Sequence, residues 1–183
     1  MLENIIGKRY SEALAKTFTD DAMLAPALDH LNTLSQAFIT NKQLAVFFAN
    51  PSIPIENKKS MVESLCGRIK VGKEIRNLLL MLTERKKIQF LQNITEYFEK
   101  VSDERLSQAR AKVISAYPLS KKNIEKLKTS LNNITGKNVL IDAEVDESLI
   151  GGVVLRMDSL VVDATIRNRL KLLKRSIEKE EVA

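Results

Sequence analysis

The spacing of apolar residues changes once along this chain of 183 residues, close to Ser107. Before that point apolar residues recur every three or four positions, which is the period of a helix with one buried face. After it, apolar and polar residues alternate in short runs, which is the period of a strand. The change predicts an α+β chain in which residues 1–105 form an N-terminal six-helix bundle and residues 106–183 form a small C-terminal α/β domain.

Six apolar stripes predict the helices of the first part, and no strand pattern interrupts them. The third stripe is short and stops before Pro51, and Pro54 suits the first turn of the helix that follows. Because the connections between the stripes are short, the helices are expected to pack as a bundle. The stripes begin with Ile6, Tyr10, Ala13, Leu14 and Thr17, continue with Leu24, Leu28, Leu31, Leu34 and Phe38, and end with Leu91, Ile94, Phe98 and Val101.

The second part has the predicted order β-α-β-β-β-α. Alternation over residues 109–116 and 139–146 predicts two strands, and the short apolar runs in residues 152–156 and 160–162 predict two more. Ser120 can cap the helix between the first two strands, and Gly136 ends it. The final helix has Ile166, Leu170, Leu173 and Ile177 on one face, and we expect this face to pack on the sheet.

The residue inventory gives little support for a metal or catalytic site. Zinc requires several Cys or His ligands, and the chain has one of each, Cys66 and His30. Cys66 lies on an apolar helix stripe, which favours a buried thiol over a nucleophile. Asp142, Glu144 and Asp146 share one side of a strand, and a solvated strand face explains them better than a bound cation. No catalytic residue, cofactor or metal is therefore predicted.

The sequence contains no candidate membrane span and no pattern typical of a secretory signal. Its apolar runs, such as residues 78–82, fall far short of the ~20 residues that a span requires. The N-terminal residues mix charges into an amphipathic pattern, without an apolar core and a small-residue cleavage site. We therefore expect no direct insertion of this chain into a membrane.

The stretch IGGVVLRMDSLVVDATIRNRLKLLKRSI, residues 150–177, combines a glycine pair with a basic helix. Gly151 and Gly152 precede a strand, whereas phosphate sites use backbone N–H groups at a helix N-terminus, so the glycines favour a tight turn or a close backbone approach. Asp163 or Thr165 is expected to cap the last helix. The basic helix leaves nucleic acid as an alternative, but the aromatic side chains that stack on bases are missing.

This stretch resembles the signature of the delta subunit family of F-type ATP synthases, which includes the mitochondrial oligomycin-sensitivity-conferring protein. Gly151, Gly152, Asp163 and Leu170 match the family pattern, while Asp158 stands where the family has a turn glycine and Thr165 replaces a serine. The resemblance covers essentially the whole chain in order. It continues in KRYSEAL (8–14), FFANPSIPIENK (47–58), LLLMLTERKKIQFLQNITEYFEK (78–100) and ARAKVISAYPLS (109–120).

The resemblance implies a non-catalytic peripheral-stalk subunit that supports ATP synthesis coupled to proton transport. It implies that residues 1–105 bind N-terminal segments of the alpha subunits and that residues 106–183 bind the C-terminal ends of the b subunits. It also implies a peripheral location on the cytoplasmic face of the bacterial cell (inner) membrane, with no nucleic acid, small-molecule substrate or cofactor. An RNA-binding or ribosome-associated adaptor is the second interpretation, and an enzyme is the third.

In the resembled family, the first and fifth helices form the surface that binds the alpha subunits. The candidate interface residues are therefore taken from these two helices. The expected alpha-subunit interface consists of Tyr10, Ala13, Asn77, Met81 and Glu84. The alternative for Tyr10 and Ala13 is that they belong to the core of the bundle. The expected b-subunit interface on the final helix consists of Arg167, Arg169 and Lys171, whose charges complement acidic residues of the b chain, and Gly151, Gly152, Asp163 and Thr165 are expected to be structural.

Overall fold

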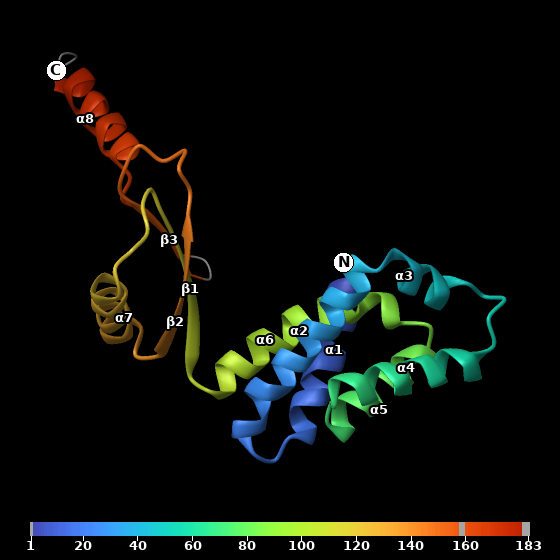
Figure 1. Cartoon of the computed structure of the whole chain (residues 1–183). Coiled ribbons are helices and arrows are strands. Elements are labelled where there is room, and N and C mark those ends of the chain that lie inside the picture. Colours follow the sequence, from blue (N-terminus) through green and yellow to red (C-terminus); the bar gives the residue numbers. More distant parts are fainter. Residues whose placement is uncertain (1, 158–159, 181–183) are drawn as a thin grey trace. The chain divides into compact units, whose positions relative to one another are not determined.

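The structure, a computed structural model, describes residues 2–157 and 160–180, and the side chains of residues 3–157 and 160–175. The chain divides into two compact units, Met1–Leu106 and Ser107–Ala183, called here the helical unit and the sheet unit (Figure 1). The α+β class is confirmed, since helices dominate and a small mixed sheet lies in the second unit. Asp158 lies outside the described residues.

The helical unit forms from amphipathic segments whose apolar faces meet in one core. The most deeply buried side chains come from four of its helices, as the apolar stripes predict: Leu24, Leu31, Leu34, Val62, Ile75, Leu79, Leu82, Leu91, Ile94 and Phe98. The unit contains α1 (Leu2–Thr17), α2 (Leu24–Thr40), α3 (Lys42–Ala49), α4 (Ile55–Ile69), α5 (Lys73–Glu84) and α6 (Leu91–Arg105), with the 3₁₀ turns η1 (Asp21–Met23) and η2 (Ile88–Phe90).

Helix α1 packs closely against α6, and Gly7 is the residue that allows this approach. A Cβ atom at position 7 would lie 2.7 Å from Tyr97 Cδ2 and 3.0 Å from the Asn93 carbonyl oxygen. Any side chain there would push the two helices apart. The close packing fixes the position of α1, which also contributes to the groove described below.

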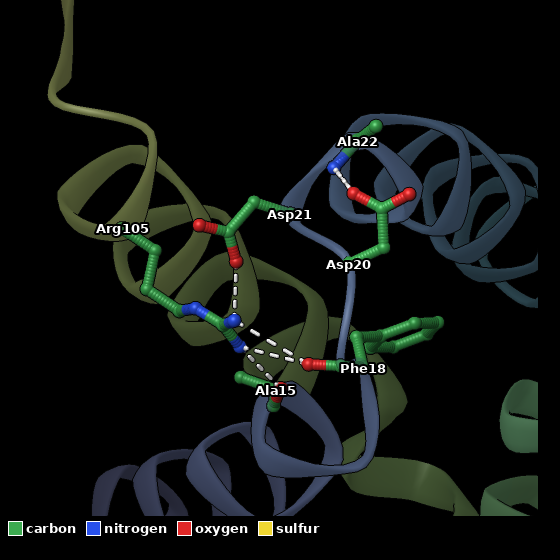
Figure 2. Close-up of polar contacts among 6 residues, drawn as sticks. All are labelled: Ala15, Phe18, Asp20, Asp21, Ala22 and Arg105. Atoms are coloured by element: carbon green, nitrogen blue, oxygen red, sulfur yellow. Dashed lines mark hydrogen bonds and ion pairs between the residues drawn. The ribbon is translucent and has the colours of Figure 1, made fainter.

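Arg105, in the last turn of α6, ties the end of α1 to the following turn (Figure 2). Its guanidinium donates hydrogen bonds to the Ala15 carbonyl oxygen at 2.6 Å and to the Phe18 carbonyl oxygen at 3.3 and 3.4 Å, and it pairs with the Asp21 carboxylate. The carbonyls at a helix C-terminus lack intrahelical partners, and a cation there also interacts favourably with the helix dipole. Arg105 therefore caps α1 from a position about ninety residues away in the chain.

Replacing Arg105 with methionine is expected to lower the free energy of unfolding by about 1–2 kcal/mol. Methionine keeps much of the apolar stem but removes the charged hydrogen bonds. Because the site is partly exposed to solvent, these bonds contribute only modestly to the free energy of unfolding. Urea unfolding of the full chain measures the change. Arg68→Met, at an exposed arginine in the last turn of α4, is the matched control and should lose less than about 0.5 kcal/mol. Equal losses in the two variants would contradict the capping role.

The sheet unit contains β1 (Gln108–Ser115), α7 (Lys121–Thr135), β2 (Asn138–Val145), β3 (Val153–Met157), β4 (Leu160–Asp163) and α8 (Ile166–Glu180). The strand order is β2-β1-β3-β4. Strands β1 and β2 are parallel and are joined by α7, whereas β3 runs antiparallel to both β1 and β4. The Ser120 hydroxyl accepts a hydrogen bond from Asn123 N at 3.3 Å and caps α7, and Gly136 ends that helix with φ 68°.

The core of the sheet unit is small. Alternate residues of β1 are buried, as the period of two predicts, but β2 buries only Val139 fully. Helix α7 covers the sheet through Leu131. One buried cluster consists of Ala109, Ala111, Leu131, Val139 and Met157, and Val113 and Ala116 are buried as well.

The prediction that the apolar face of the final helix packs on the sheet is wrong for its described part. Ile166, Leu170 and Leu173 are 45%, 59% and 59% exposed, while the side chain of Ile177 lies outside the described residues. Two residues separate the end of β4 from the start of α8, and the helix continues beyond the end of the sheet (Figure 1). In the part of α8 whose side chains the structure describes, the apolar stripe is therefore open to solvent.

Candidate functional site

A groove lies between α1 and α5 of the helical unit, with a volume of about 340 Å³. Leu14 and Leu78 are buried and form its apolar floor, while the half-buried Tyr10 and the 44% exposed Met81 contribute apolar surface beside it. Ala13 and four polar side chains line the rest. The complete lining is Tyr10, Ala13, Leu14, Thr17, Lys73, Glu74, Asn77, Leu78 and Met81.

Four residues expected at the alpha-subunit interface come together in this groove, namely Tyr10, Ala13, Asn77 and Met81. Ala13 is exposed rather than part of the core. Tyr10 belongs both to the groove, which it lines, and to the core of the bundle, against which it packs. A small residue such as Ala13 at the edge of an apolar groove lets the backbone of a bound segment approach closely.

Glu84, the fifth residue of the expected alpha-subunit interface, does not line the groove. It lies at the end of α5, where its carboxylate accepts a hydrogen bond from Lys59 Nζ of α4 at 2.8 Å. The same ammonium lies 3.7 Å from Glu56. The hydrogen bond from Lys59 lowers the pKa of Glu84 below its ordinary value. Glu84 therefore belongs to an exposed ion-pair cluster that joins α4 to α5.

Sequence reasoning missed five residues of the groove: Leu14, Thr17, Lys73, Glu74 and Leu78. A signal for them was present, since Leu14 and Thr17 follow Tyr10 at the i+4 and i+7 positions of the same helix. Lys73, Glu74, Asn77, Leu78 and Met81 show the corresponding spacing on α5. Adding the residues that share a helix face with the expected interface residues on α1 and α5 gives the whole lining.

A second surface lies in the sheet unit, on the exposed side of α8. Arg167, Arg169 and Lys171 are all exposed there, as are the apolar residues Ile166, Leu170 and Leu173. The apolar residues are spaced i, i+4 and i+7 and so form one stripe along the helix. An exposed apolar stripe with flanking cations is typical of a helix that binds another helix. We call these six residues the α8 surface.

The residues before α8 hold its start against the beginning of β3. Asp163 Oδ1 accepts a hydrogen bond from Thr165 N at 2.9 Å, and Thr165 Oγ1 accepts one from Asn168 N at 3.2 Å. Thr165 is thus the N-cap of α8, and Asp163 orders the turn before it. Side-chain and backbone hydrogen bonds from Thr165 lower the pKa of Asp163.

Both glycines of the pair lie where backbone and side chains come close. Gly152 has φ 89°, and a Cβ atom there would lie 2.4 Å from the Ala164 carbonyl oxygen. A Cβ atom at Gly151 would lie 2.6 Å from Ile166 Cδ1. The Gly151 carbonyl oxygen accepts a hydrogen bond from Ile166 N at 3.0 Å. The pair therefore fixes the junction between β3 and α8.

The described residues contain no group of three or more His, Cys, Asp or Glu side chains placed to hold a metal ion. Cys66 is buried, and burial raises the pKa of its thiol. Within the described part of the chain, no helix has the length and apolar character needed to cross a membrane. The groove and the α8 surface offer apolar contact rather than reactive groups.

A helical unit with an apolar groove, joined to a sheet unit with an exposed amphipathic helix, defines a two-part binding protein. The family model "ATP synthase delta (OSCP) subunit" matches residues 6–177. The chain belongs to this family of ATP synthase subunits, whose members are non-catalytic components of the peripheral stalk.

Individual relatives agree with this assignment along nearly the full length. ATP synthase subunit delta of Geotalea uraniireducens (strain Rf4) is 30% identical over 98% of this chain and 99% of the relative. The corresponding subunit of Anaeromyxobacter dehalogenans (strain 2CP-1) is 32% identical over 97% and 99%. A chain of the Toxoplasma gondii mitochondrial ATP synthase hexamer has the same fold, with a TM-score of 0.64, 19% identity and 97% coverage of both chains.

Proposed function

We propose that this chain links the catalytic head of an F-type ATP synthase to its membrane sector by binding two partners. The groove between α1 and α5 receives an N-terminal segment of an alpha subunit, and the α8 surface receives the C-terminal end of a b subunit. The observation that carries the proposal is that each unit of a chain from this family presents an open apolar surface, the groove in one and the α8 surface in the other.

The groove suits an amphipathic helix better than an extended or charged ligand. Its floor of Leu14 and Leu78 is apolar, and Lys73, Glu74 and Asn77 provide both charges and an amide for the polar side of the bound segment. An amphipathic helix inserts its apolar face into such a groove and leaves its polar face toward solvent. The exposed Ala13 gives the helix a place of close approach.

Replacing Ala13 with arginine is expected to weaken binding of a synthetic alpha-subunit N-terminal peptide by at least about a hundred-fold. The long side chain fills the space that the apolar face of the bound segment would occupy and removes the close approach that alanine allows. Calorimetric titration of the full chain measures the dissociation constant. Ala25→Arg, at an exposed alanine of α2 outside the groove, is the matched control and should bind normally. Unchanged affinity of the Ala13 variant would exclude the groove as the binding site.

The α8 surface suits the end of a helical stalk for a related reason. Ile166, Leu170 and Leu173 provide apolar area, and Arg167, Arg169 and Lys171 provide cations for acidic side chains of the b chain. Because these cations are exposed, they contribute more to partner selection and association rate than to affinity. The apolar stripe is therefore expected to supply most of the binding free energy.

The proposal also implies where the chain is located and which process it supports. Through its two partners the chain is held at the membrane-bound complex, on the cytoplasmic face of the bacterial cell membrane, and supports ATP synthesis coupled to proton transport. A stator link has to resist torque, which favours tight apolar contacts at both ends.

A further inference from the structure

A second cavity lies in the helical unit, away from the groove between α1 and α5, with a volume of about 580 Å³. Apolar side chains from several elements line it, among them Phe38 of α2, Phe48 of α3 and Ile88 of η2. Pro51, Ile53 and Pro54, from the connection between α3 and α4, form part of the remaining wall. We call this cavity the α3–α4 pocket.

The α3–α4 pocket contains a buried cation, Lys58 of α4, which is only 8% exposed. Its ammonium donates hydrogen bonds to the Phe48 carbonyl oxygen at 2.8 Å and to the Asn50 carbonyl oxygen at 2.7 Å. Among the residues that the structure describes, no carboxylate pairs with it. An ammonium carries three donors, so one N–H is left for a further acceptor.

A buried positive charge without a negative partner favours a carboxylate ligand. Two carbonyl oxygens satisfy hydrogen bonds but do not neutralise the charge of Lys58. A carboxylate supplies both a charge-assisted hydrogen bond and the missing charge. Lys86 also lines the pocket and is exposed, so it adds to the positive potential around the pocket.

We propose that the α3–α4 pocket binds a free medium-chain fatty acid of roughly ten carbons, a size suited to pockets of ~300–1,000 Å³. The carboxylate accepts a hydrogen bond from Lys58 Nζ, and the alkyl chain lies against Phe38, Phe48 and Ile88. This site is independent of the proposed function, since it shares no residue with the groove or with the α8 surface.

Calorimetric titration of the full chain with decanoate, below its micelle concentration, tests the proposal. Decanoate is expected to bind at a single site, and octanoate to bind roughly ten-fold more weakly, because two fewer methylenes are buried. Decanol has the same chain without the charge and is expected to bind at least about ten-fold more weakly than decanoate. Equal affinities for decanoate and decanol, or no saturable binding of decanoate, would overturn the proposal.

Three variants identify the pocket. Lys58→Met keeps the stem and removes the charge, so decanoate affinity should fall at least about ten-fold. Lys59→Met, the matched control, removes the neighbouring cation that does not line the pocket, and affinity should stay the same. Ala45→Trp fills the pocket from an exposed position of α3, so it tests the site even where Lys58→Met fails to fold. Normal decanoate binding by Ala45→Trp would overturn the assignment.

Discussion

Replacing Gly152 with alanine is expected to destabilise the sheet unit by about 3–5 kcal/mol, the range of effects that follow from backbone strain combined with a steric clash. At φ 89° an alanine is strained even where space is available. Here space is missing as well, because the new Cβ would lie 2.4 Å from the Ala164 carbonyl oxygen and 2.7 Å from Thr165 Cα. Both obstacles are backbone atoms, so relief requires β3 and the start of α8 to separate.

Gly136 provides a matched control for this prediction. It also has a positive φ, 68°, but a Cβ atom there meets nothing within 4 Å. Gly136→Ala should therefore cost only about 1 kcal/mol, the strain alone. Amide hydrogen exchange in β1 and β3 of the full chain measures the stability of the unit directly. Losses of similar size in the two variants would show that the close approach at Gly152 is not the cause.

Placing aspartate at both Leu170 and Leu173 is expected to weaken binding of a soluble b-subunit dimer by at least about a hundred-fold. Both leucines are 59% exposed, so the free chain loses little stability. In a complex, however, two carboxylates would lie in the apolar centre of the contact, where charged groups without partners are most costly. Surface plasmon resonance with immobilised b dimer gives the dissociation constant.

The control for the α8 variant is Ile134→Asp, which changes an apolar residue of α7 that is 78% exposed. It alters apolar surface in the same unit but outside the α8 surface, so b binding should persist. Reversing the charge of Arg167 and Arg169 should give a smaller loss that disappears at high salt, because both side chains are exposed. A double aspartate variant that still binds b normally would remove α8 from the interface.

Periodicity predicted the helical unit well because its residues obey local rules. The stripe from Leu24 to Leu34 is buried along its length, and β1 buries every second residue as alternation requires. The groove followed partly from the same rule, since Tyr10 and Ala13 share one face of α1 with Leu14 and Thr17. Glu84 lies outside the groove lining, and its partner Lys59 lies on another helix, a pairing about which spacing along one helix carries no information.

Spacing also cannot indicate what covers an apolar face. The stripe of Ile166, Leu170 and Leu173 reads the same whether the sheet or a partner chain packs against it, and the structure leaves it open. Arg105 and Lys58 were missed for a different reason. Both read as ordinary surface cations in the sequence, yet one caps a distant helix and the other is buried against carbonyl oxygens. These contacts join residues that are brought together only by the fold.

The central claim is that one chain joins two partners through separate surfaces. Its most direct test is the retention of the catalytic head, containing alpha subunits, on immobilised b dimer. We predict retention only when this chain is added, and loss of retention with either Ala13→Arg or the double aspartate variant of α8. The Ala13 variant should still bind b alone, and the α8 variant should still bind the head alone. Retention of the head without the chain, or undiminished retention with both variants, would contradict the account.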